Sequence, residues 1–530
     1  MIRFNDFSIC KKKNILNRMD PKTATAADPK RKQTRLRRIG GSKREMFVPV
    51  FFLFLSAAFS LSAESYDSYR RDDLLLLGDG KRDLTGQGRF FSFRKNETEK
   101  RETIPGENEA PGAYANLHAI YRGLTQYGGA EREKADVSFS RAILSPEAGY
   151  VRKREHLYYQ ILISPFLSYE ENVNGTRTIS KGADGELLGI GGWDSAFWKL
   201  GLEAGRGYQR LDRNGFLFAG FLNYGEVSFL WKPLGLSFSG IAAQTNGSVL
   251  YTERDRNESP ARISGGSIRF GDGPIIQNFR IFYYLYAESR QEAVKGDLFR
   301  ESQPFRPYGR YAYYGFEFSS GSFEGFRFDS DAIAVSGSRE YGTDAFRSYQ
   351  TSRSTSAGFA GGRIVWEREE ASYFLGGLFF SKDEELRTDR NSDGYSGIRT
   401  DLRGYGGKTS FLLSQSLLLQ EGTVFPPDGT SKRPDFENKG MGLVQAGARK
   451  TWDSRWTLQG ILLSSSSPLG RGWEAVAVGG YESEYSYILM SLSYAKVDPQ
   501  KQERFLFEEW RKKAEDKEYA RIYLSAGAYF

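Results

Sequence analysis

The last twelve residues of the chain, 519–530, read YARIYLSAGAYF, and they decide the fold class. From Ala520 onward every second position is apolar or small, while the positions between carry Arg521, Tyr523 and Ser525. Because a β-strand points alternate side chains to opposite faces, one face of this segment suits hydrocarbon and the other suits water. The alternation predicts a strand of a transmembrane β-barrel.

Upstream segments repeat this alternation and extend the prediction to much of the chain. The clearest of them lie near residues 157–169, 196–204, 279–287 and 488–494. In each, the apolar face suits lipid and the polar or small face suits the lumen. Segments near 323–335 and 361–368 alternate poorly, and we interpret them either as strands that cross outside the hydrocarbon or as strands in another register.

Polar connections of two lengths separate these segments. Short ones lie at 212–215 and 231–235, and long ones at 171–187, 245–260, 289–304, 338–354, 382–402, 421–438 and 499–518. Long and short connections roughly alternate, as in barrels with extracellular loops and periplasmic turns. We therefore predict an all-β chain whose residues 89–530 form a transmembrane antiparallel up-and-down β-barrel of about 16–18 strands.

The net charge of +8 comes from the N-terminal part of the chain. Residues 1–63 hold 14 of the 74 basic and 4 of the 66 acidic residues, so the remainder has 60 basic and 62 acidic residues and a net charge of −2. Proteins that bind nucleic acid usually present a strong basic excess. The body of this chain has none, and we expect no nucleic-acid partner.

The N-terminal region resembles a basic leader followed by a signal peptide. A basic stretch precedes the apolar run at 46–61, whose 16 residues fall short of the roughly 20 that cross a bilayer as a helix. We predict cleavage after Ala63, Sec-dependent export into the periplasm and a short periplasmic lead at 64–88; an inner-membrane anchor is the alternative. The single cysteine, Cys10, lies in the predicted leader 1–63, so we expect no disulfide in the mature chain.

The end of the chain also carries a family resemblance. Its alternation and its terminal Tyr529 and Phe530 resemble the C-terminal assembly signal of outer-membrane β-barrel proteins. The resemblance implies that the outer membrane is the destination, and that outer-membrane lipid and the barrel-assembly machinery are partners.

The predicted register places one set of polar residues on the lumen side. These candidate pore-lining residues are Lys199, Glu203, Arg280, Tyr284, Arg521 and Tyr523. Basic side chains in a pore favour anions, whereas an inward glutamate makes the pore mixed in charge. In its size and its balance of arginine and tyrosine the chain resembles the alginate-export family of outer-membrane barrels, which implies a polar solute or a polysaccharide as cargo.

One connection has the spacing of a calcium-binding loop. Oxygen-bearing side chains alternate at Asp389, Asn391 and Asp393, and Gly394 permits a sharp bend. Thr400 stands where such loops place a bidentate glutamate. We predict no cofactor other than structural Ca²⁺ in loop 389–400, with a turn rich in Asp and Asn as the alternative.

Two function classes remain open. The only histidines are His118 and His156, and the residues two positions after them are Ile120 and Tyr158, so the His–Ser pattern of the outer-membrane phospholipase family is absent. We therefore predict that the chain is not an enzyme. The first class is a pore for passive passage or export of small or extended polar solutes. The second is a surface-exposed barrel whose long loops act as an adhesin or a structural envelope protein. No pattern indicates an oligomeric state.

Overall fold

The computed structural model describes most of the chain between residues 112 and 529. The described ranges are 112–128, 137–174, 176–245, 261–271, 275–289, 308–340, 352–368, 371–383, 391–398, 410–414, 434, 436, 440–452, 455–468, 470–482, 486–499 and 517–529. The predicted leader at 1–63, the lead at 64–88 and the terminal Phe530 lie outside the described residues.

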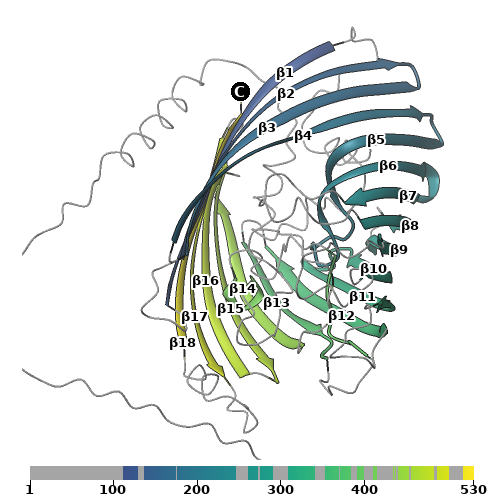
Figure 1. Cartoon of the computed structure of the whole chain (residues 1–530). Helices are drawn as coiled ribbons and strands as arrows, with labels where there is room; N and C mark the ends of the chain where they lie inside the picture. The colour runs from purple at the N-terminus through teal and green to yellow at the C-terminus, as the bar shows by residue number, and fades with distance from the viewer. Residues whose placement is uncertain are drawn as a thin grey trace, which may run out of the picture. The chain divides into compact units, whose positions relative to one another are not determined.

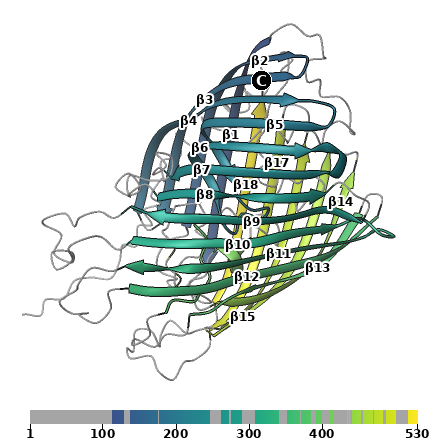
Figure 2. The same ribbon diagram turned by 90° about the vertical axis from the view of Figure 1, so that its right-hand side faces the viewer.

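Eighteen antiparallel strands form one closed barrel in which each strand pairs with its neighbours in sequence. They are β1 (Gly112–Gly128), β2 (Val137–Arg154), β3 (Leu157–Asn174), β4 (Thr176–Asp194), β5 (Trp198–Arg210), β6 (Ala219–Trp231), β7 (Leu236–Thr245), β8 (Ala261–Gly271), β9 (Ile276–Glu288), β10 (Tyr308–Ser320), β11 (Phe326–Glu340), β12 (Ser352–Glu367), β13 (Ala371–Phe380), β14 (Met441–Trp452), β15 (Trp456–Ser467), β16 (Gly470–Glu482), β17 (Ser486–Pro499) and β18 (Lys517–Tyr529). Figures 1 and 2 show the strands following one another around the barrel.

The barrel closes where the first strand meets the last. β1 pairs with β18 from His118 opposite Tyr529 to Gly128 opposite Tyr519. Two short helices lie in the described parts of the connections, η4 (Lys232–Leu234) and α4 (Phe411–Ser414). None of the helices in the described part of the chain is long and apolar enough to cross a membrane. The predicted all-β, up-and-down barrel with about 16–18 strands is confirmed.

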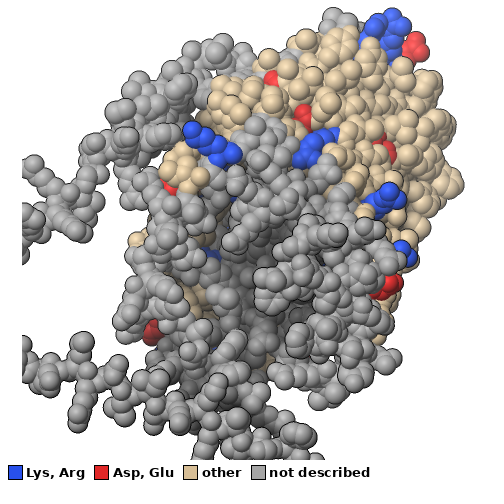
Figure 3. All heavy atoms as spheres, in the orientation of Figure 1, with Lys and Arg blue, Asp and Glu red and all other residues tan. Residues whose placement is uncertain are grey.

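The outer face of the barrel is apolar and its inner face is polar. Large apolar side chains such as Ile161, Leu202 and Leu462 point outward and are 51–64% exposed, whereas inward neighbours such as Gln160 and Glu203 are buried. On the face seen in Figure 3, charged side chains are few among uncharged ones. Such exposed apolar surface is what a strand presents to lipid, so the barrel is built to span a membrane.

Aromatic rings gather at the end of the barrel that carries the short turns. Trp193, Trp198, Phe229 and Phe238 flank the β4–β5 and β6–β7 turns, and successive ring centroids lie 6.4 Å apart. Near the β12–β13 turn, the ring of Trp366 lies 5.5 Å from that of a neighbouring tyrosine on β13. Rings in these positions form the aromatic girdle that membrane barrels place at the boundary of the hydrocarbon.

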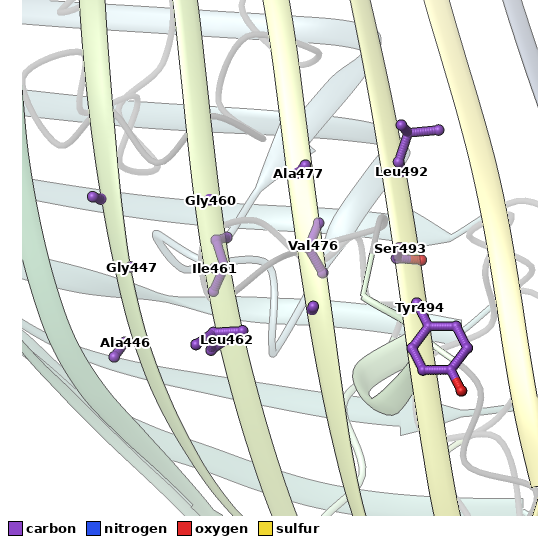
Figure 4. Close-up of a pocket in the computed structure, with 12 residues that line it drawn as sticks. Ala446, Gly447, Gly460, Ile461, Leu462, Val476, Ala477, Leu492, Ser493 and Tyr494 are labelled. Atoms are coloured by element: carbon purple, nitrogen blue, oxygen red, sulfur yellow. The ribbon is translucent and has the colours of Figure 1, made fainter.

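The outer wall has a shallow hollow of ≈ 620 Å³ over β14–β17 (Figure 4). Its floor consists of small outward residues, whereas Leu462, Leu492 and Tyr494 stand at its sides. The small residues are Ala446, Ala448, Gly460, Ala475 and Ala477. The hollow therefore belongs to the lipid-facing surface and not to the lumen.

Three sequence-based assignments are corrected by the structure. Residues 171–187 are not a loop, because β3 and β4 continue through them up to the single residue between Asn174 and Thr176. Their sequence lacks apolar alternation since both faces are polar, although the backbone pairing is continuous. The predicted loops 382–402 and 421–438 belong to one β13–β14 connection, which contains α4 and no described strand between them.

The third correction concerns the two segments that alternate poorly, which form β11 and β12. In β11 the inward positions change from charged residues, Asp329 and Asp331, to apolar ones, Ile333 and Val335. The apolar inward residues pack in the cluster formed with connections inside the barrel. Packing inside the lumen, and not an altered register, removes the simple alternation.

Candidate functional site

The β5–β6 hairpin leaves the barrel wall and enters the lumen. β5 pairs with β4 only as far as Arg206, while β5 and β6 pair with each other up to Arg210 opposite Ala219. We call residues 207–221 the inward hairpin. The bend begins at Gly205, where φ is +140° and a Cβ atom would lie 2.0 Å from the carbonyl oxygen of Leu187. Only glycine tolerates this combination of conformation and close approach.

The inward hairpin crosses the lumen from one wall to the other. On one side Phe221 packs on Ile120 of β1 and Ile143 of β2. On the other side the ring of Phe216 lies 4.3 Å from that of Phe359 on β12, measured between centroids. Contacts with both walls place this hairpin across the path through the barrel.

Asp212 fixes the shape of the hairpin's tip. Its carboxylate accepts hydrogen bonds from the backbone N–H groups of Phe216 at 2.7 Å, Leu217 at 2.9 Å and Phe218 at 3.1 Å. Burial, assisted by the negative charge of Glu317, raises the pKa of Asp212 to about 6, although these three hydrogen bonds act in the opposite direction. The tip is therefore built around one buried carboxyl group in the connection between the two strands.

Arg213 attaches the tip to the opposite wall. Glu317 and Asp331 face each other across β10 and β11; we call them the acidic pair. The backbone N–H of Arg213 donates to Glu317 at 2.7 Å, and its guanidinium Nη2 donates to Asp331 at 2.6 Å. Asn214 donates a further hydrogen bond of 2.5 Å to Asp331. Two like charges placed opposite each other repel, so the acidic pair provides a binding place for this arginine.

A second connection enters the lumen from β13–β14 and meets the hairpin. The hydroxyl of Tyr395 donates to the carbonyl of Phe216 at 3.0 Å, and the N–H of Ile398 donates to the carbonyl of Leu217 at 2.8 Å. Both hairpin residues are fully buried. The two connections thus form one packed body inside the barrel.

The same β13–β14 connection is held on the far wall by Glu474 of β16. The Glu474 carboxylate accepts from the hydroxyl of Ser410 at 2.8 Å and from the backbone N–H groups of Phe411 at 2.6 Å and Leu412 at 3.0 Å. The ring of Phe411 stacks on Tyr519 of β18 at 4.1 Å. The described parts of this connection therefore contact the inner wall at two places, near β12 and near β16–β18.

The predicted pore-lining residues all lie on the inner face of the barrel. Arg280 and Tyr284 are buried, and the Arg280 guanidinium donates to the Tyr284 hydroxyl at 2.7 Å and lies 3.4 Å from Glu317. Arg521 donates to the Ser410 carbonyl at 3.3 Å. The basic charges expected to line an open pore are therefore engaged with the wall or with the inserted connections.

The remaining three lie on other parts of the inner wall. Glu203 accepts a hydrogen bond from the hydroxyl of Tyr224. Lys199, near the short-turn end, lies 3.8 Å from Asp194. Tyr523 is buried on the inner face of β18. Tyr529 of the predicted assembly signal lies in β18 beside β1.

The described part of the predicted calcium loop is bonded to the barrel wall. Asn391 accepts from the Ser354 hydroxyl at 2.5 Å, and Asp393 accepts from the Ser356 N–H at 2.9 Å. Asp389 lies outside the described residues. Among the described residues no three His, Cys, Asp or Glu side chains are grouped to hold a metal ion. The calcium site stays a prediction.

Sequence reasoning missed the inward hairpin and its acidic pair. Residues 212–215 have the composition of a simple turn, which predicts a short connection outside the barrel. The structure places them in a connection that enters the lumen. One signal was present. Phe216, Leu217 and Phe218 form an apolar run without alternation, which is typical of residues buried on all sides.

Comparisons with known proteins give similarity in fold only. No protein-family model and no curated protein matches the chain, so the resemblance to the alginate-export family has no support. Among solved structures, Pseudomonas aeruginosa OccK5 (OpdH) has 10% identity and a TM-score of 0.43, over 79% of this chain and 98% of that one. A BenF-like porin from Pseudomonas fluorescens Pf-5 has 8% identity and a TM-score of 0.47, over 78% and 99%. Pseudomonas aeruginosa OccK2 (OpdF) in complex with glucuronate has 12% identity and a TM-score of 0.43, over 79% and 98%. Identities of 8–12% say nothing about a shared solute.

Proposed function

We propose that this chain is an outer-membrane channel for the passive passage of small polar solutes, narrowed by the inward hairpin and the β13–β14 connection. The observation that carries the proposal is a closed eighteen-stranded barrel with an apolar outer face and a polar inner wall. A barrel of this strand number has an interior wider than its own side chains fill. Connections that enter the lumen narrow this interior but leave a passage beside them.

Small solutes fit this arrangement better than extended polysaccharides. The inward hairpin touches β1–β2 and β12, and the β13–β14 connection touches β12 and β16–β18. Crossing segments divide the lumen, so a solute must pass beside them. A narrowed lumen discriminates by solute size.

Solute flux into liposomes tests the proposal. The mature chain, residues 64–530, is refolded, its barrel is confirmed by heat-dependent gel mobility, and it is reconstituted into liposomes. We expect swelling in an isosmotic pentose such as arabinose and much slower swelling in the trisaccharide raffinose. Folded protein that admits neither sugar would contradict the proposal. Equal rates for both would contradict the narrowing.

The adhesin or structural alternative depends on long loops such as 382–402, whose described residues Tyr395 and Ile398 bond to the inward hairpin. The other long connections, such as 245–260 and 289–304, lie almost wholly outside the described residues. No described contact favours it over the channel. The swelling assay also separates the two classes, since an adhesin barrel needs no flux.

A further inference from the structure

Eight charged side chains form one cluster where the inward hairpin meets the wall. Their inner-wall positions lie on β9–β12, and Arg213 joins them from the hairpin. We call them the ion-pair cluster: Arg213, Arg280, Arg327, Arg363, Glu317, Asp329, Asp331 and Glu367. By formal charge, the four basic and four acidic side chains sum to zero.

Each arginine of the cluster has an acidic partner within 3.4 Å. Arg213 lies 2.6 Å from Asp331, and Arg280 lies 3.4 Å from Glu317. Arg327 bridges Glu367 at 2.8 Å and Asp329 at 3.3 Å. Arg363 lies 2.9 Å from Asp329. The positive and negative side chains lie next to each other on the same wall of the barrel. Their electric fields therefore largely cancel, and little electric field remains across the lumen.

Two further charges beside the cluster have opposite signs. Asp212 lies at the hairpin's tip, and Arg269 of β8 stands opposite Arg280. Asp212 is further compensated by the three backbone N–H groups that it accepts from. Together, Asp212 and Arg269 add no net formal charge to that of the cluster.

Two neutral amide side chains are buried on the inner wall beside the cluster. Asn278 of β9, opposite Ser319, has no hydrogen-bond partner among the described residues at either its amide nitrogen or its amide oxygen. Gln445 of β14, opposite Gly376, likewise lacks a partner at both amide atoms. An amide offers both donors and an acceptor, as a hydroxyl does, whereas a carboxylate only accepts.

From this geometry we infer that the channel selects uncharged, hydroxyl-rich solutes over charged solutes of the same size, because the ion-pair cluster cancels its own charge. The inference rests on the proposed channel function and adds the solute class. Arginines without acidic partners in the lumen would make the channel prefer anions. We expect no such preference here, since Glu317 neutralises the charge of Arg280.

Three sugars of one ring size test the inference: glucose, glucuronate and glucosamine. Their initial uptake rates are measured in proteoliposomes that contain the folded mature chain and no imposed membrane potential. We expect glucose to enter faster than either charged sugar. Faster entry of glucuronate or glucosamine than of glucose would overturn the inference but leave the channel intact. Absence of uptake for all three would instead overturn the channel itself.

Charge-removing variants test whether the cluster is the cause. Glu317→Gln removes the acid paired with Arg280, and Asp331→Asn removes the nearer acid of Arg213, which leaves only Asp329 at 3.9 Å. Each should raise the ratio of glucuronate to glucose uptake, by roughly tenfold, the lower end of the effect of charge focusing on encounter. Two different acids are substituted because either variant can fail to fold. Heat-dependent gel mobility shows whether each variant has folded.

The matched control is Asp194→Asn. It also removes one acidic charge, but from the β4–β5 turn, where Asp194 lies beside Lys199 and Lys232. This variant should leave the uptake ratio at the wild-type value. An equal rise in the control and in the two cluster variants would show that overall charge, and not the cluster, sets the preference.

Discussion

Arg213 is the side chain on which attachment of the inward hairpin depends most. Its guanidinium is 13% exposed and approaches Asp331 and Asp329, while its backbone binds Glu317. Removing one partner of a buried ion pair leaves a charge without compensation and costs about 3–5 kcal/mol. Arg213→Ala should therefore destabilise the barrel by that order, because Glu317 and Asp331 are left facing each other.

Heat-dependent gel mobility, which reports the temperature of barrel unfolding, measures this loss. Arg455→Ala is the matched control, since Arg455 is exposed in the short turn before β15. Surface substitutions of this kind usually change stability by less than about 0.5 kcal/mol. Equal losses in both variants would contradict the role assigned to Arg213.

Asp212 makes stability depend on pH. Its pKa is about 6 in the folded chain, against 3.8 for an unperturbed aspartate. The folded state therefore binds a proton that the unfolded state releases between these values. The resulting stabilisation is complete below pH 3.8 and is lost as the pH rises through about 6. The gap between the two pKa values corresponds to about 3 kcal/mol.

Chemical unfolding of the wild type and of Asp212→Asn at several pH values isolates this one group. Between about pH 7.5 and about pH 4.5, the wild type should gain stability relative to the variant, by at most about 3 kcal/mol. Other titrating residues cancel in the difference. A difference that stays constant over this range would show that burial does not perturb Asp212.

At the scale of elements, the bend at Gly205 determines whether β5 can leave the wall. An added Cβ would meet the carbonyl oxygen of Leu187 at 2.0 Å, at a φ of +140°. Such strain costs about 1–3 kcal/mol. Gly205→Ala should loosen the inward hairpin and speed tryptic cleavage after Arg213. Gly225→Ala is the control, because nothing lies within 4 Å of its Cβ position. Equal cleavage rates in the two variants would contradict the hinge.

The α4 segment should be released by Glu474→Ala. The substitution removes the acceptor of one hydroxyl and two backbone N–H groups, and each unsatisfied buried donor costs about 1–3 kcal/mol. Modification of a cysteine placed at Leu413, in a mature chain that lacks Cys10, should become faster with a maleimide reagent. Glu518→Ala is the control, since that side chain is 60% exposed. Slow modification in both backgrounds would show that Glu474 is not the anchor.

Regular elements were predictable from sequence, and the inserted connections were not. Residues 519–530 and 279–287 alternate because lipid and water select opposite faces, and both lie in strands. Residues 171–187 lack this signal because polar residues and glycine occupy most of their positions, although β3 and β4 continue through them. The attachment of Arg213 to Glu317 and Asp331 joins residues more than one hundred positions apart. Periodicity contains no information about such contacts.

At the scale of the whole barrel, two kinds of pairing make the structure. Main-chain pairing of β1 with β18 closes the wall, so no strand edge remains within the eighteen-stranded sheet. Side-chain packing then fills part of the interior. Residues of the inward hairpin and of the β13–β14 connection pack with inner-wall residues in one hydrophobic cluster. In the proposed channel, the wall provides passage through a membrane, and the inserted segments determine how wide that passage is.

Single-channel conductance tests this account most directly. The wild-type mature chain is compared with a variant in which Asn-Gly replaces residues 211–218, because Arg210 and Ala219 are paired and a two-residue turn can join them. We predict discrete conductance steps for both proteins, with larger steps for the shortened variant. Folded barrels that stay silent in both forms would contradict the channel, and equal steps would contradict the constriction by the inward hairpin.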